Sequence, residues 1–150
     1  MMSELEELKA LLPGDVEDMR LLMCQLSPRL QLAAALLEQV VSAPDSHLYV
    51  VRREGHIVAC ATLCVSHTPE GTLGGVESVV VSSVCRGKGY GRLLMEHLLQ
   101  EATRLGCHKL HLTSRPSRVA ANRLYQGLGF VLHETNCYQM RCPEMGGCHS

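Results

Sequence analysis

A run of valines, a glycine-rich loop and an amphipathic helix follow one another in the middle of this chain, and they restrict its fold more than any other segment. The run Val76–Ser82 is apolar on both faces at its centre, which is typical of a strand inside a sheet. Leucines at three- and four-residue spacing predict a helix over Gly89–Leu105. A short strand, Lys109–Thr113, follows. A crossover of this length joins two strands that lie side by side and parallel.

Two helices and a strand are expected in the first 45 residues. A short segment, Leu5–Leu12, is interpreted as a first strand. Apolar residues at helical spacing then predict a helix from Asp15 to about Leu26. Ser27-Pro28 predicts the start of a second helix, which continues to about Val41, because serine is a good N-cap and proline suits the first helical position.

From Leu48 onwards the hydrophobic period changes to that of strands. Leu48–Arg53 and Ile57–His67 are rich in β-branched residues and are separated by a short turn, so they predict a hairpin. Thr68–Gly75 holds one proline and three glycines and predicts a loop.

The chain after the crossover predicts one more helix and one more strand. The helix is expected at Ser117–Leu128, stopped by Gly129, and the strand at Phe130–Met140. We expect a single domain over residues 1–150, with a core of about 5–140 and a tail at 141–150. An exposed final strand could pair with a second subunit, so a homodimer is also expected.

The composition excludes two classes of partner. Lys plus Arg number 14 against 15 for Asp plus Glu, a net charge of −1, and the only aromatic side chains are four Tyr and one Phe. We therefore expect no nucleic-acid partner, because such proteins carry a basic face and often a base-stacking platform. No stretch approaches the roughly 20 apolar residues of a membrane span, so no membrane partner is expected either.

Eight cysteines are scattered through apolar stretches. The first residues are acidic where a secretory signal would be basic, so the sequence favours a cytoplasmic protein with reduced thiols. Cys137, Cys142, Cys148 and His149 gather near the C-terminus but form no C-x2-C pair, and we expect no metal site.

Arg86–Gly91, with the sequence RGKGYG, separates the central strand from the start of a helix. Glycines there permit positive φ, and backbone N–H groups together with the helix dipole can hold a phosphate or pyrophosphate. A P-loop is excluded, because it requires G-x4-G-K followed by Ser or Thr. The dinucleotide fingerprint is excluded as well, because the glycines at 87, 89 and 91 have the wrong spacing and the next strand ends without an acidic residue.

The loop instead matches the pattern R/Q-x-x-G-x-G/A, with Arg86, Gly89 and Gly91 in the specified places. It resembles the acyl-CoA pyrophosphate loop of the GNAT superfamily of N-acetyltransferases. A second segment, Asn122–Phe130, is similar to the closing N-x-x-Y and G-F element of that family, and the order of elements agrees from about residue 15 to residue 140.

This resemblance implies a mixed α/β fold, with a mostly antiparallel central sheet flanked by helices and a V-shaped opening between the strands ending near Ser82 and Thr113. The pantetheine arm of acetyl-CoA is expected to lie in this opening, where a backbone N–H polarises the thioester carbonyl. Lys88 and Arg92 are expected to add positive charge beside the phosphates; a solvated basic surface is the alternative explanation for these two residues. The residues expected to bind acetyl-CoA are Val79, Val80, Val81, Arg86, Gly87, Lys88, Gly89, Tyr90, Gly91, Arg92, Asn122 and Tyr125.

The resemblance also implies roles in catalysis. Tyr125 occupies the position of the family's tyrosine, and a phenol of pKa about 10 is protonated at neutral pH and can act as general acid toward the leaving thiolate. A packed core tyrosine is the alternative. Glu77 is the candidate general base; the alternative is an edge glutamate in solvent, with a water chain or backbone carbonyls taking the proton instead. Three histidines, at positions 67, 108 and 111, are rival bases by residue type only.

The acceptor is less constrained than the donor. Val76–Val81, Cys85–Lys88 and Gly106–Lys109 are similar to segments of glucosamine-6-phosphate N-acetyltransferases, although Thr113 stands where those enzymes carry an acidic residue. The resemblance implies transfer of acetyl to the primary amine of a small molecule or an amino sugar phosphate. A peptide or protein amine and a catalytically silent acyl-CoA-binding module are the alternatives.

Overall fold

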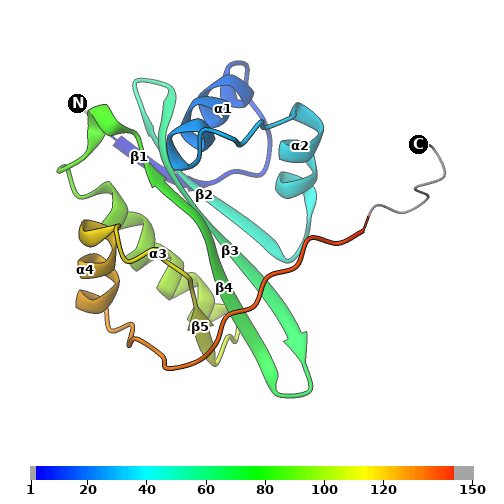
Figure 1. The fold of residues 1–150 in the computed structure, drawn as a ribbon. Coiled ribbons are helices and arrows are strands. Elements are labelled where there is room, and N and C mark those ends of the chain that lie inside the picture. Colours follow the sequence, from blue (N-terminus) through cyan, green and yellow to red (C-terminus); the bar gives the residue numbers. More distant parts are fainter. Residues whose placement is uncertain (1–2, 144–150) are drawn as a thin grey trace.

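Five strands form one mixed sheet in the computed structural model of the protein, which describes residues 3–143 (Figure 1). Their order across the sheet follows the chain, and all neighbours are antiparallel except the last pair, which is parallel. This arrangement confirms the predicted fold class and the parallel pair. The strands are β1 (Ser3–Glu7), β2 (Ser46–Arg53), β3 (His56–Thr68), β4 (Gly71–Val81) and β5 (Lys109–His111).

Helices cover both faces of this sheet (Figure 1). On one face, α1 and α2 pack through Leu22 and Leu37 against Val50 and Ile57. None of the described helices is long and apolar enough to cross a membrane. The helices are α1 (Asp15–Leu26), α2 (Ala34–Ser42), α3 (Tyr90–Arg104) and α4 (Val119–Gly127), with a short 3-10 turn at Ser83–Cys85.

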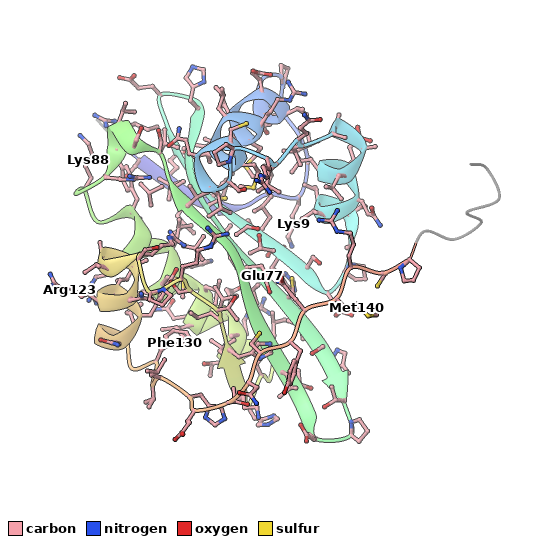
Figure 2. All side chains as sticks on the ribbon, in the orientation of Figure 1. Lys9, Glu77, Lys88, Arg123, Phe130 and Met140 are labelled. Atoms are coloured by element: carbon pink, nitrogen blue, oxygen red, sulfur yellow. The ribbon has the colours of Figure 1, made fainter. Side chains whose placement is uncertain are left out.

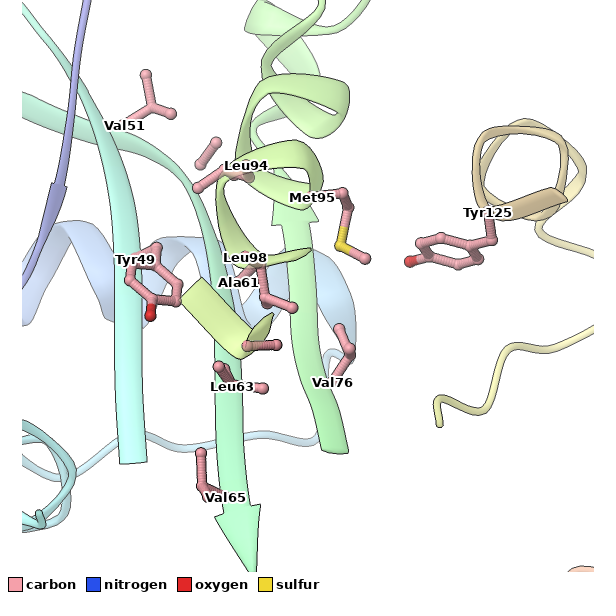
Figure 3. Packing of buried hydrophobic residues seen from close by; sticks show 12 residues of the cluster. Tyr49, Val51, Ala61, Leu63, Val65, Val76, Leu94, Met95, Leu98 and Tyr125 are labelled. Carbon is pink, nitrogen blue, oxygen red and sulfur yellow. The ribbon is translucent and has the colours of Figure 1, made fainter. Parts of the chain in front are cut away.

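The other face of the sheet packs against α3. Figure 3 shows Leu94 and Leu98 of this helix against Leu63 of β3, with Tyr49 of β2 beside them. All four side chains are completely buried. Burying a side chain of this size stabilises the fold by about 1.5–3 kcal/mol, so this contact holds α3 against the sheet.

The parallel pairing of β4 and β5 is short. Leu73, Gly74 and Gly75 pair with residues 109–111. Beyond Gly75, β4 continues to Val81 and pairs only with β3 on its other side. The two parallel strands therefore diverge, as the family resemblance implied.

A β-bulge interrupts β4 within this diverging part. Glu77 pairs with Thr62 and Val80 pairs with Cys60, so β4 has one residue more than β3 between these two pairs. Ser78 lies there with φ 52°, and its carbonyl accepts a hydrogen bond from Cys60 Sγ at 3.4 Å. The extra residue changes the direction of the groups that follow it in β4: the edge of the strand to which a backbone N–H points, and the face of the sheet on which a side chain lies.

The prediction of a loop at Thr68–Gly75 was wrong. β3 extends to Thr68, and β4 already begins at Gly71, so the loop is reduced to a tight turn. The glycines lie in the strand because its neighbour is close: a Cβ on Gly74 would overlap Leu110 Cδ2. They allow contact between strands rather than forming a turn.

The predicted starts of the first strand and of the second helix also need correction. β1 occupies Ser3–Glu7 instead of Leu5–Leu12, because its pairing with β2 ends where the chain turns toward α1. Ser27-Pro28 closes a turn in which Leu30 N donates to Ser27 O at 3.0 Å, and α2 begins only at Ala34. Of the intervening apolar residues, Leu32 packs against the core beneath α1 and α2, whereas Leu30 is 42% exposed.

The predicted last strand, Phe130–Met140, is absent. The described part of the chain after Phe130 has no regular secondary structure, and the side chains of Val131, Leu132, Tyr138 and Met140 are between 81% and 90% exposed. β5 spans only three residues, so it provides a short edge for a further strand to pair with.

A buried ion pair joins α1 to the sheet. Arg52 donates to both carboxylate oxygens of Asp15, at 2.8 and 2.9 Å, and its Nε lies 2.6 Å from Glu6 Oε1. Asp15 also accepts a hydrogen bond from Leu12 N at 2.8 Å. The hydrogen bonds from Arg52 hold the pKa of Asp15 below its usual value. The start of α1 is thereby fixed against β1 and β2.

We predict that Gly74→Ala destabilises the protein by about 1–3 kcal/mol, because the added methyl overpacks the β4–β5 contact against Leu110. Gly75→Ala is the matched control: its Cβ would meet only ordinary contacts, the nearest at 3.6 Å from His111 Nε2. Urea unfolding of both variants measures the difference. Equal stabilities would show that Leu110 moves aside at no cost.

Asp15→Asn is expected to destabilise the protein by about 3 kcal/mol or more at neutral pH, because Arg52 loses its buried carboxylate partner. Since folding lowers the pKa of Asp15, its contribution is present above about pH 4 and is lost as the pH falls through the folded pKa. The difference in free energy of unfolding between the wild type and Asp15→Asn should therefore become smaller as the pH falls. Glu17→Gln, an exposed change on the same helix, should shift stability by less than about 0.5 kcal/mol.

Candidate active site

A cavity of about 560 Å³ opens where β4 has diverged from β5. Its walls come from four places: the end of α1, the last residues of β4, the glycine-rich loop with the start of α3, and α4. The lining residues are Gln25, Leu26, Val79, Val80, Val81, Cys85, Arg86, Gly87, Gly89, Tyr90, Gly91, Arg92, Arg118, Val119, Ala120, Ala121, Leu124 and Tyr125.

The glycine-rich loop forms one end of this cavity. Gly87 and Gly89 have φ values of 80° and 84°, in the left-handed region that favours glycine. Gly89 is the N-cap of α3, so the first N–H groups of that helix have no acceptor within it. These N–H groups and the positive end of the helix dipole suit a phosphate group.

The last residues of β4 form the floor. Ser82 N donates to Val58 O at 2.8 Å, so β4 is still bonded to β3 at its end. Successive backbone N–H groups of a strand face opposite edges, and the N–H of Val81 therefore faces the edge that β5 has left. This edge can bond an extended ligand in the way a further strand would.

Tyr125 projects from α4 toward Met95 of α3 in Figure 3. Its side chain is only 5% exposed and lines the cavity, and its ring lies edge-on to Phe130 at 6.1 Å. Burial raises the pKa of Tyr125, and the nearby Arg118 guanidinium opposes this rise without cancelling it. The phenol is therefore protonated at neutral pH and can donate a proton.

Three arginines line the cavity. Arg86 Nε donates to Val81 O at 3.4 Å, which connects the loop to the floor. Arg92 pairs with Glu96 at 3.3 Å along α3, and Arg118 immediately precedes α4. These cations make the cavity attractive to an anionic ligand.

Three residues predicted for the site do not line this cavity. Lys88 lies at the exposed outer end of the loop (Figure 2). Asn122 Nδ2 donates to Arg115 O at 3.0 Å and so fixes the start of α4. Glu77 is exposed on β4 opposite Thr62, just before the bulge. The roles given to these three side chains remain predictions.

The rival histidines lie elsewhere. His67, His108 and His111 are exposed, and none lines the cavity. Between residues 3 and 143, no group of three His, Cys, Asp or Glu side chains gathers where it could hold a metal ion. Cys148 and His149 fall outside the described residues.

Sequence reasoning named Tyr125 but missed its neighbours on α4 and the whole wall that α1 provides. Ala121, Leu124 and Tyr125 share one face of α4 at helical spacing, and this pattern could have been found around the tyrosine. Gln25 and Leu26 carry no such signal, because they reach the cavity only through the packing of α1 on the sheet. Gln25 Oε1 accepts a hydrogen bond from Ser83 N at 2.8 Å.

Two diverging parallel strands beside a glycine-rich loop are typical of the acyl-CoA N-acyltransferase fold. The sequence matches the family described as acetyltransferase (GNAT) over residues 16–130, and the chain belongs to this family.

Individual relatives agree with this assignment. The chain is 32% identical over 93 residues to the IAA acetyltransferase of Azospirillum brasilense, covering 62% of this chain and 60% of that protein. It is 29% identical over 120 residues to glucosamine 6-phosphate N-acetyltransferase 1 of Oryza sativa subsp. japonica, covering 73% and 71%. The chain thus spans less than two thirds of the Azospirillum relative. An acetyltransferase structure from Trypanosoma brucei matches with a TM-score of 0.75 and 28% identity, covering 95% of this chain and all of that one.

We predict that Arg118→Gln weakens acetyl-CoA binding by about tenfold or more, because it removes a half-buried cation from the cavity. Arg123→Gln is the control, since Arg123 is an exposed cation of the same region that does not line the cavity. Isothermal titration calorimetry measures both dissociation constants. Equal affinities would show that Arg118 does not contact the ligand.

Proposed function

We propose that this protein transfers the acetyl group of acetyl-CoA to a primary amine. The observation that carries this proposal is that one cavity combines an anion-binding loop, an open strand edge and a buried, protonated tyrosine. Membership of the GNAT family supports the choice of acetyl-CoA as donor.

The residues of the cavity fit such a donor. Backbone N–H groups of the loop and the first turn of α3 would hold its pyrophosphate, with Arg86 and Arg92 adding charge. The pantetheine arm would lie along Val79–Val81, parallel to the open edge. A backbone N–H at this edge would stabilise the negative charge that develops on the thioester oxygen.

The reaction then requires two proton transfers. The amine nitrogen attacks the thioester carbon, the tetrahedral intermediate collapses, and the carbon–sulfur bond breaks with its electron pair on sulfur. Tyr125 would give its proton to the leaving thiolate, which its raised pKa permits at neutral pH. The proton lost by the amine would pass to Glu77 or to a water chain.

We further propose that the acceptor is a small amine. The names of the relatives indicate different acceptors, so they do not decide among them. A peptide or protein acceptor would need an open groove formed by a loop at residues 68–75. This segment belongs to the β3–β4 hairpin instead, which favours a small acceptor. A silent acyl-CoA-binding module would have no need of a buried tyrosine in the cavity.

We also propose an assembly and a location for the protein. The exposed apolar side chains between Val131 and Met140 support a homodimer formed through this segment. The seven cysteines among the described residues are free thiols, which supports a reducing, cytoplasmic location.

Wild-type protein is expected to release free CoA thiol from acetyl-CoA when an amine acceptor is present. Tyr125→Phe should lower kcat by about 10²- to 10⁴-fold, because the thiolate loses its proton donor, with acetyl-CoA affinity nearly unchanged. Tyr138→Phe is the control, since that side chain is 86% exposed. Full kcat in Tyr125→Phe would remove this residue from the role, and binding of acetyl-CoA without turnover of any amine would favour the silent module.

A further inference from the structure

A second cavity, of about 230 Å³, lies on the face of the sheet that α1 and α2 cover. Its walls come from α1, from the irregular segment before α2, from α2 itself and from three strands of the sheet. The lining residues are Met19, Met23, Leu30, Gln31, Leu32, Leu36, Leu37, Val40, Leu48, Cys60, Thr62 and Ser78.

The lining of this cavity is apolar. Eight of its twelve residues are Leu, Met or Val, and none is charged. The strand-side polar groups are the hydroxyls of Thr62 and Ser78. A phosphate placed here would lose its hydration without gaining a cation, which is strongly unfavourable. An aliphatic chain or an aromatic ring would gain from burial at the same place.

The second cavity adjoins the acetyl-CoA cavity along two elements. On β4, Ser78 lines the second cavity and the next residue, Val79, lines the first. On α1, Met23 lines the second and Gln25 the first. A ligand that reaches Ser78 in the second cavity therefore lies at the bulge of β4, one residue along the strand from the wall of the first cavity.

Polar groups gather at the bulge. Ser78 is exposed and lies in the bulge, and the carboxylate of Glu77 precedes it on the strand. Glu77 shares its register pair with Thr62, which also lines the second cavity. Glu77 itself lies outside the lining of this cavity, so an ammonium group at the bulge would meet the hydroxyls of Thr62 and Ser78, while the body of the molecule meets leucine and methionine.

We propose that the second cavity holds the apolar body of the acceptor, so that the substrate class is a primary amine carrying one aromatic ring or a branched or linear aliphatic chain. This inference rests on the proposed function and makes it specific. The volume of the second cavity is below the roughly 300–1,000 Å³ of pockets for drug-sized ligands, which suits a single ring or a short chain. The proposal excludes amino sugar phosphates as acceptors, because the second cavity offers no cation to a phosphate group.

The test compares kcat/KM for unbranched alkylamines of increasing length, for phenethylamine and for glucosamine 6-phosphate. Each added methylene that is buried should raise kcat/KM by about fourfold until the cavity is full. Phenethylamine should exceed glucosamine 6-phosphate by about tenfold or more. A flat series, or a preference for the sugar phosphate, would overturn the inference while leaving acetyl transfer intact.

Two matched variants locate the effect. Leu36 lines the cavity and is 50% exposed, and Leu21, on α1, is 56% exposed without lining it. Leu36→Gln should flatten the chain-length series and raise KM for phenethylamine by about tenfold, whereas Leu21→Gln should leave both unchanged. Equal effects of the two substitutions would refute the placement.

A binding measurement separates this inference from the proposed reaction. Phenethylamine, added without acetyl-CoA, should shift the NMR signals of the Met19 and Met23 methyl groups. If these signals shift although no amine is acetylated, the proposed reaction fails and the apolar site stands. If they respond to Leu132→Ser and not to phenethylamine, the chain's own apolar segment fills the cavity and the proposal is overturned.

Discussion

The brevity of the β4–β5 pairing is the constraint on which the site depends. Three residue pairs join these parallel strands, and β4 then extends to Val81 with its β5-side edge open. A longer pairing would fill this edge with backbone hydrogen bonds, and no extended ligand could use it. The glycines of β4 allow β5 to approach closely at the start, and α3 and α4 then cover the opening from the side.

The parts of the fold that the sequence could predict are those determined by local chemistry. The period of Val76–Ser82, the loop after it and the helix at 90–104 all follow from side chains within a few residues of one another, and the structure places them as expected. The same holds for the residues of the anion-binding loop, because positive φ at Gly87 and Gly89 is a property of those residues themselves. Tyr125 could be found because a motif surrounds it.

The errors share a different physical origin. Glycines at 71, 74 and 75 usually indicate a loop, but here they lie in a strand, and at Gly74 the neighbouring Leu110 leaves no room for a side chain. Ser27-Pro28 has the chemistry of a helix start, yet α2 begins only at Ala34, and Leu32 before it packs against the core instead. The apolar start of the segment after Gly129 favours a strand, but a strand also requires an edge to pair with. Gln25 and the second cavity likewise arise from how α1 and α2 lie on the sheet, which no local pattern records.

The two cavities differ in the kind of atom that forms their contacts. Backbone N–H groups of the loop and of β4 supply part of the first, beside side chains such as Arg118 and Tyr125, whereas side chains of Leu, Met and Val form most of the second. A point mutation replaces a side chain and leaves the peptide groups in place, so drift in the sequence can reshape most of the second cavity but leaves the backbone part of the first unchanged. In evolutionary terms, such a protein can exchange one acceptor for another over generations while it keeps a single acyl donor.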